Sequence, residues 1–539
     1  MNRREFLQRT ACTTAAAVAA LSSGCVTSPG DARAAASGIP PFVLEEVTIA
    51  ALQQGLLEGN YSAAELVRLY QGRIAAVDQQ GPKLKAVLEL NPEALAIAER
   101  LDAERHTKGP RGPLHGIPIL IKDNIDTHDR MQTTAGSLAL AGSIAPRDAF
   151  VVERLRAAGA VILGKTNLSE WANFRGGRSF SGWSARGGQT RNPYFTDRNP
   201  SGSSSGSAVA TSANLCAASV GTETNGSIVS PASHCGIVGL KPTVGLVSRA
   251  GIIPIAATMD TAGPMTRTVA DAAVLLGVLA GTDPRDAVTQ NIPSGTPVEY
   301  TQFLEAGALR GARLGVLRSQ FRLHSKVDPI MEGALSALKQ NEAILVDASL
   351  PSLAGLSEAR FQVMLYEFKA GLNDYFTALG PTAPVKSMEE LIAFNERERA
   401  RELPLFGQEL LMEAAAKGPL TEPAYLAAKA KVKEWAAVLT RFMDELQVEA
   451  LIAPTTGPAA TIDYIHGERG LGGSSTPAAT AGFPHITVPC GQLYGLPMGL
   501  SFYGRAWSEP RLLALAYAFE QHTKARIVPQ FRRSLESAL

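Results

Sequence analysis

Hydrophobic and polar positions in the first third of the chain predict, in order, two helices, a strand, a helix and a strand. A capping-box pattern, S-A-A-E, begins at residue 62 and opens a run of apolar residues at helical spacing that reaches residue 77. A second helical run covers about residues 92–106. The segment 116–122, G-I-P-I-L-I-K, then predicts a short buried strand that ends in a lysine. Residues 149–158 predict another helix, and residues 160–164 predict the strand that follows it.

This alternation of helices with apolar strands is typical of a sheet whose strands run largely in parallel. The pattern predicts further strands at about residues 313–317, 448–453, 485–490 and 498–503. We therefore expect one large α/β domain over residues 45–530, in which helices cover both faces of a central mixed, largely parallel, twisted sheet. Residues 355–445 have a mainly helical pattern, and we expect them to form an insertion within this domain.

The first 34 residues have the pattern of an export signal. Paired arginines at positions 3 and 4 precede a mildly apolar segment over residues 11–21, which is typical of a bacterial twin-arginine signal. We expect this signal over residues 1–34 and a linker over residues 35–44. The sequence A-R-A at 32–34 fits a cleavage site, whereas L-S-S-G-C, which ends at Cys25, resembles an imperfect lipoprotein box. We favour a soluble periplasmic product, and the sequence leaves open a lipid anchor at Cys25.

The composition narrows the classes of partner. The 539 residues are 45% hydrophobic and 19% charged, which is enough for a large buried core. The net charge is +1 and the basic residues form no block, so nucleic acid is not an expected partner. No apolar run reaches the roughly 18–20 residues that a membrane helix needs, so we expect no stable membrane insertion after the leader is cleaved.

The cysteines indicate no metal site. Beyond the two in the leader, Cys216, Cys235 and Cys490 lie in apolar or small-residue segments and have no metal-ligand spacing. We expect them to pack as small core residues, and the sequence leaves open whether Cys216 and Cys235 pair. We expect no metal or other cofactor, and we favour a monomer.

The chemistry is concentrated in residues 199–242, where glycines and hydroxyl side chains stand close together. Glycine allows backbone amides to approach a ligand, so a hydroxyl among glycines is a candidate nucleophile with amide donors near it. A flexible Gly/Ser linker would have a similar composition. Here, however, the run leads into a predicted buried helix and then a predicted strand, which a linker would not do.

A histidine-based triad is not favoured. None of the eight histidines lies in a context that suggests one. Residues 202–206, G-S-S-S-G, match a nucleophile elbow centred on Ser204, but that elbow needs a strand before it. The preceding residues are polar and interrupted by prolines, so we disfavour Ser204 as the nucleophile.

Several ordered segments together resemble the amidase signature family. They are residues 121–124 (I-K-D-N), 202–207 (G-S-S-S-G-S), 221–227 (G-T-E-T-N-G-S), 239–243 (G-L-K-P-T) and 260–265 (D-T-A-G-P-M). The resemblance extends over residues 45–525 and implies the fold of that family. Within the family the chain is most similar to bacterial peptide amidases, through residues 182–189 and 507–510.

The resemblance implies a Ser–Ser–Lys triad. The nucleophile corresponds to Ser227, the bridging serine to Ser203 and the base to Lys122, and the two serines have the family spacing of 24 residues (227 − 203). It also implies a cis peptide bond between Gly202 and Ser203. A lysine acts as a base only when neutral, so we expect burial to lower the pKa of Lys122 well below about 10.4. The similarly placed Lys165 we expect to be structural.

The resemblance also implies an oxyanion hole made of backbone N–H groups, those of Thr224, Asn225, Gly226 and Ser227. Many family members have Gly-Gly before the nucleophile, so Asn225 is a departure that narrows the site or adds a polar contact. Members that act on acidic substrates often carry an arginine two or three residues after the nucleophile. Those positions hold Val229 and Ser230 here, which favours a neutral amide.

We therefore expect an exported hydrolase that cleaves carboxamide C–N bonds, most favourably the C-terminal amide of peptides, and releases ammonia through an acyl-enzyme. One alternative is an amidase for small aryl or aliphatic amides. A second is a subunit similar to those of glutamyl-tRNA amidotransferase, which works in a complex. A third is a catalytically silent binding protein, against which Lys122, Ser203 and Ser227 argue because all three are retained.

Overall fold

The computed structural model describes residues 39–321 and 324–538. The chain divides into two units, Met1–Pro41 and Phe42–Leu539. Of the first unit only residues 39–41 are described, and they form neither helix nor strand. The predicted export signal and Cys25 therefore lie outside the described residues.

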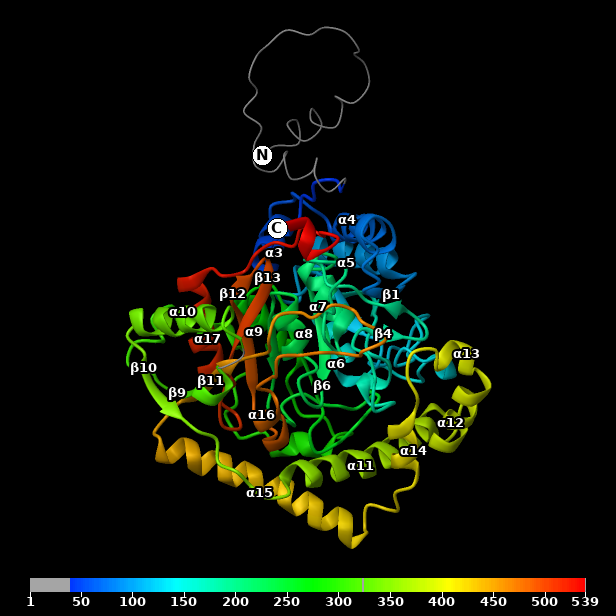
Figure 1. The fold of residues 1–539 in the computed structure, drawn as a ribbon. Helices are drawn as coiled ribbons and strands as arrows, with labels where there is room; N and C mark the ends of the chain where they lie inside the picture. The colour runs from blue at the N-terminus through cyan, green and yellow to red at the C-terminus, as the bar shows by residue number, and fades with distance from the viewer. Residues whose placement is uncertain (1–38, 322–323, 539) are drawn as a thin grey trace. The chain divides into compact units, whose positions relative to one another are not determined.

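An 11-stranded sheet runs through the second unit, in the order β1-β3-β2-β6-β8-β7-β12-β13-β11-β9-β10 (Figure 1). Its strands are β1 (Val87–Leu90), β2 (Pro118–Lys122), β3 (Val161–Thr166), β6 (Ala218–Glu223), β7 (Val238–Lys241), β8 (Thr261–Thr266), β9 (Arg313–Leu317), β10 (Ile344–Ala348), β11 (Ala450–Pro454), β12 (His485–Leu493) and β13 (Leu496–Tyr503). The short strands β4 (Trp183–Ser184) and β5 (Gly188–Gln189) pair separately.

The described α-helices are α3 (Ile49–Leu57), α4 (Ala63–Arg73), α5 (Ala94–Lys108), α6 (Phe150–Ala157), α7 (Ser205–Ser212), α8 (Val229–His234), α9 (Val269–Leu279), α10 (Asp328–Gln340), α11 (Leu356–Leu379), α12 (Met388–Arg397), α13 (Arg399–Glu402), α14 (Glu409–Ala415), α15 (Pro423–Glu445), α16 (Thr476–Ala481) and α17 (Glu509–Thr523). The helices and strands predicted from the hydrophobic pattern are confirmed, with ends that differ by a few residues.

The sheet is mixed, as predicted, but parallel pairs do not dominate it. Parallel pairing is confined to two wings, β3–β2–β6 and β11–β9–β10, and the other six of the ten pairings are antiparallel. The expectation of a largely parallel sheet is wrong at the centre because the connections there are not helical crossovers. β12 and β13 form a hairpin through Tyr494 and Gly495, which both have positive φ, and residues 242–260 join β7 to β8 without a helix.

Helices cover both faces of this sheet, as predicted. On one face, Ser219 of β6 donates a hydrogen bond to α7, and Gly239 of β7 lies so close to α8 that an added Cβ would fall 2.6 Å from the Cβ of Ala232. On the opposite face, Phe502 of β13 packs edge-on against Phe519 of α17, with ring centroids 5.9 Å apart. Because successive strand residues point to opposite faces, the sheet is buried on both sides.

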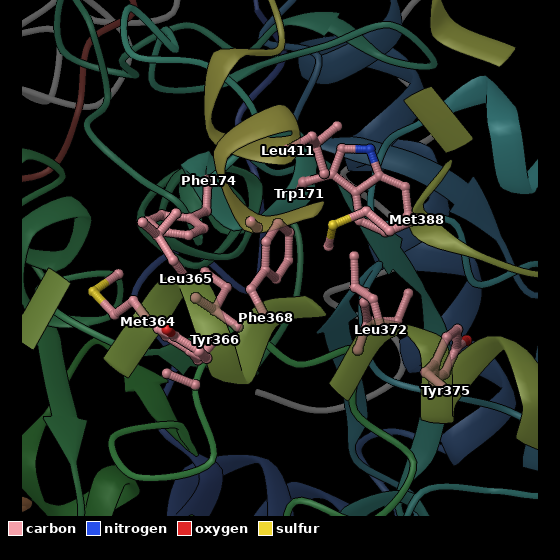
Figure 2. Packing of buried hydrophobic residues seen from close by; sticks show 14 of the residues in the cluster. Trp171, Phe174, Met364, Leu365, Tyr366, Phe368, Leu372, Tyr375, Met388 and Leu411 are labelled. Atoms are coloured by element: carbon pink, nitrogen blue, oxygen red, sulfur yellow. The ribbon is translucent and has the colours of Figure 1, made fainter. Parts of the chain in front are cut away.

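Residues 356–445 contain α11–α15, and α11 and α15 lie side by side at the lower edge of Figure 1. Figure 2 shows residues of α11, α12 and α14 packed around Trp171 and Phe174, which come from the segment after β3. The rings of Phe174 and Phe368 pack edge-on with their centroids 5.2 Å apart, and those of Trp171 and Phe376 do so with centroids 6.4 Å apart. Truncation of a buried aromatic residue typically costs about 3–5 kcal/mol, so this cluster holds the segment of Trp171 firmly against α11.

Candidate active site

Lys122 is the last residue of β2, and all five residues of that strand are buried. Its side chain has no exposed surface. Its Nζ donates hydrogen bonds to Ser203 Oγ at 2.8 Å, to Thr222 Oγ1 at 2.8 Å and to the Thr222 carbonyl at 3.3 Å. The structure thus brings two of the three predicted triad residues into direct contact.

The surroundings of Lys122 favour the neutral amine. Burial lowers the pKa of Lys122 to about 7, and the negative charges of Asp260 and Glu223 offset only part of that effect. A substantial fraction of the amine is therefore free of its proton near neutral pH, as a general base requires.

Ser203 lies in the turn before α7, and the Gly202–Ser203 peptide bond is cis, as the resemblance implies. The Ser203 carbonyl accepts a hydrogen bond from the N–H of Ser169 at 3.0 Å. A Cβ on Gly202 would fall 2.2 Å from Ser169 Oγ, so no residue larger than glycine fits there without a shift. These close contacts fix the position of the Ser203 hydroxyl beside Lys122.

Ser227 follows β6 in the loop that leads to α8, and its residue surface is 8% exposed. The N–H of Ser204 donates to the Ser227 carbonyl at 3.1 Å. The Ser204 hydroxyl donates to the Thr222 carbonyl and accepts from the Thr222 N–H, at 3.0 and 3.1 Å. Ser204 therefore ties the turn of Ser203 to the loop of Ser227, and its own hydroxyl is occupied by backbone groups.

Four successive amides, the last of them that of Ser227, have unused donors. Within the described residues, no hydrogen bond uses the backbone N–H of Thr224, Asn225, Gly226 or Ser227. Buried or partly buried N–H groups are nearly always paired, so a run of unpaired donors points to a ligand. An oxyanion is such a ligand, and these are the four groups predicted to bind it.

The loop that carries these amides is held from both sides. The Glu223 carboxylate accepts hydrogen bonds from the N–H groups of Ile228 and Val229, at 2.8 and 3.1 Å. Thr224 Oγ1 donates to Asp260 Oδ1 at 2.6 Å. Because both ends of the loop are fixed, its N–H groups keep their directions without a bound ligand.

Asn225 adds a polar contact, as the departure from Gly-Gly predicts. Its Oδ1 accepts a hydrogen bond from Ser475 Oγ at 2.8 Å, and its Nδ2 donates to Thr476 Oγ1 at 3.2 Å. Gly226, in contrast, has φ +80°, and a Cβ there would fall 2.9 Å from Ser475 Oγ. The loop thus requires glycine at position 226 but not at position 225.

Two residues of the site are not predicted from the sequence, although both lie within its amidase-like motifs. Thr222 Oγ1 accepts hydrogen bonds from Lys122 and from Asn124 Nδ2, the latter at 3.0 Å. The Asp260 carboxylate accepts hydrogen bonds from the Thr224 hydroxyl and from two backbone N–H groups. The carboxyl ends of the parallel strands β2 and β6 and the start of the antiparallel strand β8 meet at one edge of the sheet, which brings these residues to Lys122.

The remaining candidates have structural surroundings. Lys165 is fully buried, and its Nζ donates to the Ile125 carbonyl at 2.6 Å and to Thr133 Oγ1 at 2.9 Å. Cys216, Cys235 and Cys490 are free thiols, which answers the open question of a disulfide. Among residues 39–321 and 324–538, no group of His, Cys, Asp and Glu could hold a metal ion, and no helix is long and apolar enough to cross a membrane.

Known proteins match the chain over nearly its whole length. The family model described as Amidase matches residues 65–513. The crystal structure of native peptide amidase from Stenotrophomonas maltophilia is 51% identical, with a TM-score of 0.87, and the match covers 91% of this chain and 100% of that one. An Arabidopsis thaliana relative named "Probable amidase" is 41% identical over 508 residues, which are 91% of this chain and 92% of the relative. A glutamyl-tRNA(Gln) amidotransferase subunit from Chloroflexus aurantiacus is 38% identical over 496 residues, which are 89% of this chain and 97% of that protein.

Proposed function

This chain belongs to the amidase family and hydrolyses amide C–N bonds, and on that premise we propose that its substrates are peptides with a C-terminal amide, from which it releases ammonia. The similarity to the Stenotrophomonas maltophilia peptide amidase supports this substrate class. The absence of an arginine at Val229 and Ser230 agrees with a neutral group at the reacting end.

In the proposed mechanism, neutral Lys122 accepts the proton of Ser203, and Ser203 accepts the proton of Ser227. The Ser227 oxygen then attacks the amide carbon, and the carbonyl oxygen becomes an oxyanion that the N–H groups of residues 224–227 bind. The C–N bond breaks as the leaving nitrogen takes a proton back through Ser203, which gives ammonia and an acyl-enzyme. Water, activated by the same relay, hydrolyses the ester to a carboxylic acid and restores Ser227.

The observation that carries this mechanism is the 2.8 Å hydrogen bond between Lys122 Nζ and Ser203 Oγ, two side chains with no exposed surface. A hydroxyl both donates and accepts, so Ser203 is able to pass a proton between two neighbours. The N–H of Ser204, the residue after Ser203, donates to the Ser227 carbonyl, and this bond between the two loops supports a relay from Ser227 to the Ser203 hydroxyl.

The test is ammonia release from a panel of amides. We expect kcat/KM for a dipeptide amide to exceed that for benzamide and for a short aliphatic amide by at least about tenfold, since 1.4 kcal/mol of extra binding to the peptide part gives that factor. A higher efficiency with the small amides would support the first alternative. Ammonia release from glutamine that needs an added partner would support the amidotransferase alternative, and no release from any amide would contradict the whole proposal.

We propose further that the protein is exported through its twin-arginine segment and works in the periplasm. Paired arginines are the defining feature of that signal, so changing Arg3 and Arg4 together to lysine in the full chain is expected to retain the protein in the cytoplasm. Cell fractionation followed by immunoblotting measures this. Equal amounts of wild-type and variant protein in the periplasm would contradict the proposal, and metabolic labelling with a fatty acid would report a lipid anchor at Cys25.

A further inference from the structure

A cavity of about 450 Å³ lies next to the loop of residues 224–227, and Thr224 is part of its lining. Thr222 and Thr224 line its buried end, and Arg147 and Asp374 line its exposed end. The loop before β8 and one side of α11 form its walls. This volume falls in the range of pockets for small ligands, about 300–1,000 Å³.

Residues at the buried end of the cavity contact or adjoin the proposed catalytic groups. Thr222 Oγ1 is 2.8 Å from Lys122 Nζ, and the N–H of Thr224 is the first of the four unpaired donors. Asn124, which also lines the cavity, is 2% exposed, and its Oδ1 has no hydrogen-bond partner in the described part of the chain. An amide bound at Ser227 would therefore have this cavity directly beside it.

Part of the cavity wall is apolar, and one segment of it has backbone angles that cost free energy. Ile253, Pro254 and Ile255 form one wall, and Ala172 lies in another. Ala172 and its neighbours on both sides, Trp171 and Asn173, all have left-handed φ angles of 50–72°. Such angles cost non-glycine residues about 1–3 kcal/mol each and persist only where the surroundings enforce them. The packing of Trp171 in the cluster of Figure 2 provides that enforcement.

Most of the charged side chains described at the cavity already have partners within the protein, whereas two do not. Arg249 forms an ion pair with Asp286, and Arg285 pairs with Asp283 and Glu153. Inside the cavity, Asp260 receives hydrogen bonds from Thr224 and from backbone N–H groups. In contrast, the side chains of Asp374 and Arg147 form no hydrogen bond or ion pair with any described residue, so both are available to a ligand.

We propose that this cavity holds the peptide part of the substrate and that Asp374 at its mouth binds the free α-ammonium group, so the enzyme prefers short peptide amides with an unblocked N-terminus. This inference rests on the proposed function. A peptide amide has lost its C-terminal charge, so when its residues are neutral its α-ammonium is its one ionised group, with a pKa of about 7.7–8.0. Asp374 complements that cation, whereas Arg147 would favour a carboxylate that such a substrate lacks.

The experiment compares Ala-Phe-NH2 with its N-acetylated form at pH 6.5, where the free peptide is protonated. We expect the wild-type enzyme to have the higher kcat/KM with the free peptide. Asp374→Asn should lower that efficiency about three- to fivefold through KM, as expected for a partly solvated ion pair, and leave the acetylated peptide unaffected. Asp374→Lys should reverse the preference in favour of an N-succinylated peptide. Glu358→Gln is the matched control, because Glu358 is an exposed acid 16 residues earlier in α11, roughly 24 Å away along the helix axis.

The outcomes separate this inference from the proposed function. Equal kcat/KM for the free and the acetylated peptide would overturn only the inference about Asp374 and leave the proposed function standing. An equal loss of kcat/KM with both peptides in Asp374→Asn would do the same. Hydrolysis of neither peptide by wild-type enzyme that still cleaves benzamide would overturn both the inference and the proposed substrate class.

Discussion

Replacing Ser227 with alanine is expected to lower kcat for ammonia release by about 10⁴-fold or more, because the loss of a serine nucleophile removes the covalent path altogether. Circular dichroism and the melting temperature should stay close to those of the wild-type protein, since no hydrogen bond of the described structure uses the Ser227 side chain. Mass spectrometry after a brief reaction with a slow ester substrate should find an acyl group on residue 227 of the wild-type chain and none on the variant.

The matched control is Ser204→Ala. Ser204 adjoins the same turn, but both hydrogen bonds of its hydroxyl go to the backbone of Thr222. We expect this variant to lose about 1–3 kcal/mol in the free energy of unfolding, because its change removes the acceptor of the buried Thr222 N–H. A fluorophosphonate probe should still label it at Ser227. Labelling at Ser204, or undiminished turnover in Ser227→Ala, would place the nucleophile elsewhere.

The second large effect concerns Lys122. Lys122→Arg is expected to lose activity by about 10³-fold or more at every pH, because a guanidinium stays protonated and cannot act as the base. In the wild-type enzyme, burial lowers the pKa of Lys122 to about 7. The proposed base is the neutral amine, so kcat/KM should be constant well above pH 7 and fall about tenfold per pH unit below it. A pH–rate profile with an uncharged substrate measures this.

Two further variants test whether that profile belongs to Lys122. Lys165→Met removes a second buried lysine, and we expect it to lower stability without moving the midpoint of the profile. Lys122→Met should be inactive yet more stable near neutral pH. The pKa of Lys122 is depressed from 10.5 on folding, so the unfolded chain binds its proton more tightly, and the free energy of unfolding rises with pH between about 7 and 10.5. The Met variant should lack that slope. A midpoint near pH 7 that persists in an active Lys122 variant would refute the assignment.

Much of the fold follows from the sequence because many of its elements are strongly apolar. β2, for example, is P-I-L-I-K, and its burial is evident from composition alone. β6 is not predicted, because A-S-V-G-T-E has the small and polar residues of a loop. It is a strand because β2 and β8 pair with it on both sides. Tertiary pairing of this kind overrides local propensity and leaves no local signal.

The residues of the candidate site can be predicted from the sequence for a different reason. The resemblance of ordered motifs locates Lys122, Ser203 and Ser227, and the structure brings Lys122 and Ser203 into contact. Motifs do not reveal which side chains meet across strands, so the contact of Thr222 with Lys122 and the bond of Asp260 to Thr224 become visible only in three dimensions. The partners of Asn225 lie 250 residues away in the chain, beyond the reach of any local pattern.

The unpaired amides of residues 224–227 lower the free energy of unfolding of the resting protein. Leaving donors without acceptors disfavours folding, and here the carboxylate of Glu223 and the hydroxyl of Thr224 keep the loop in that state rather than letting it relax. Under the proposed mechanism, the catalytic dipoles are oriented before the substrate arrives, so no reorganisation energy is spent when negative charge builds up on the carbonyl oxygen. The unpaired amides thus raise the free energy of the resting enzyme and lower the activation free energy of the reaction, which is what preorganisation means in thermodynamic terms.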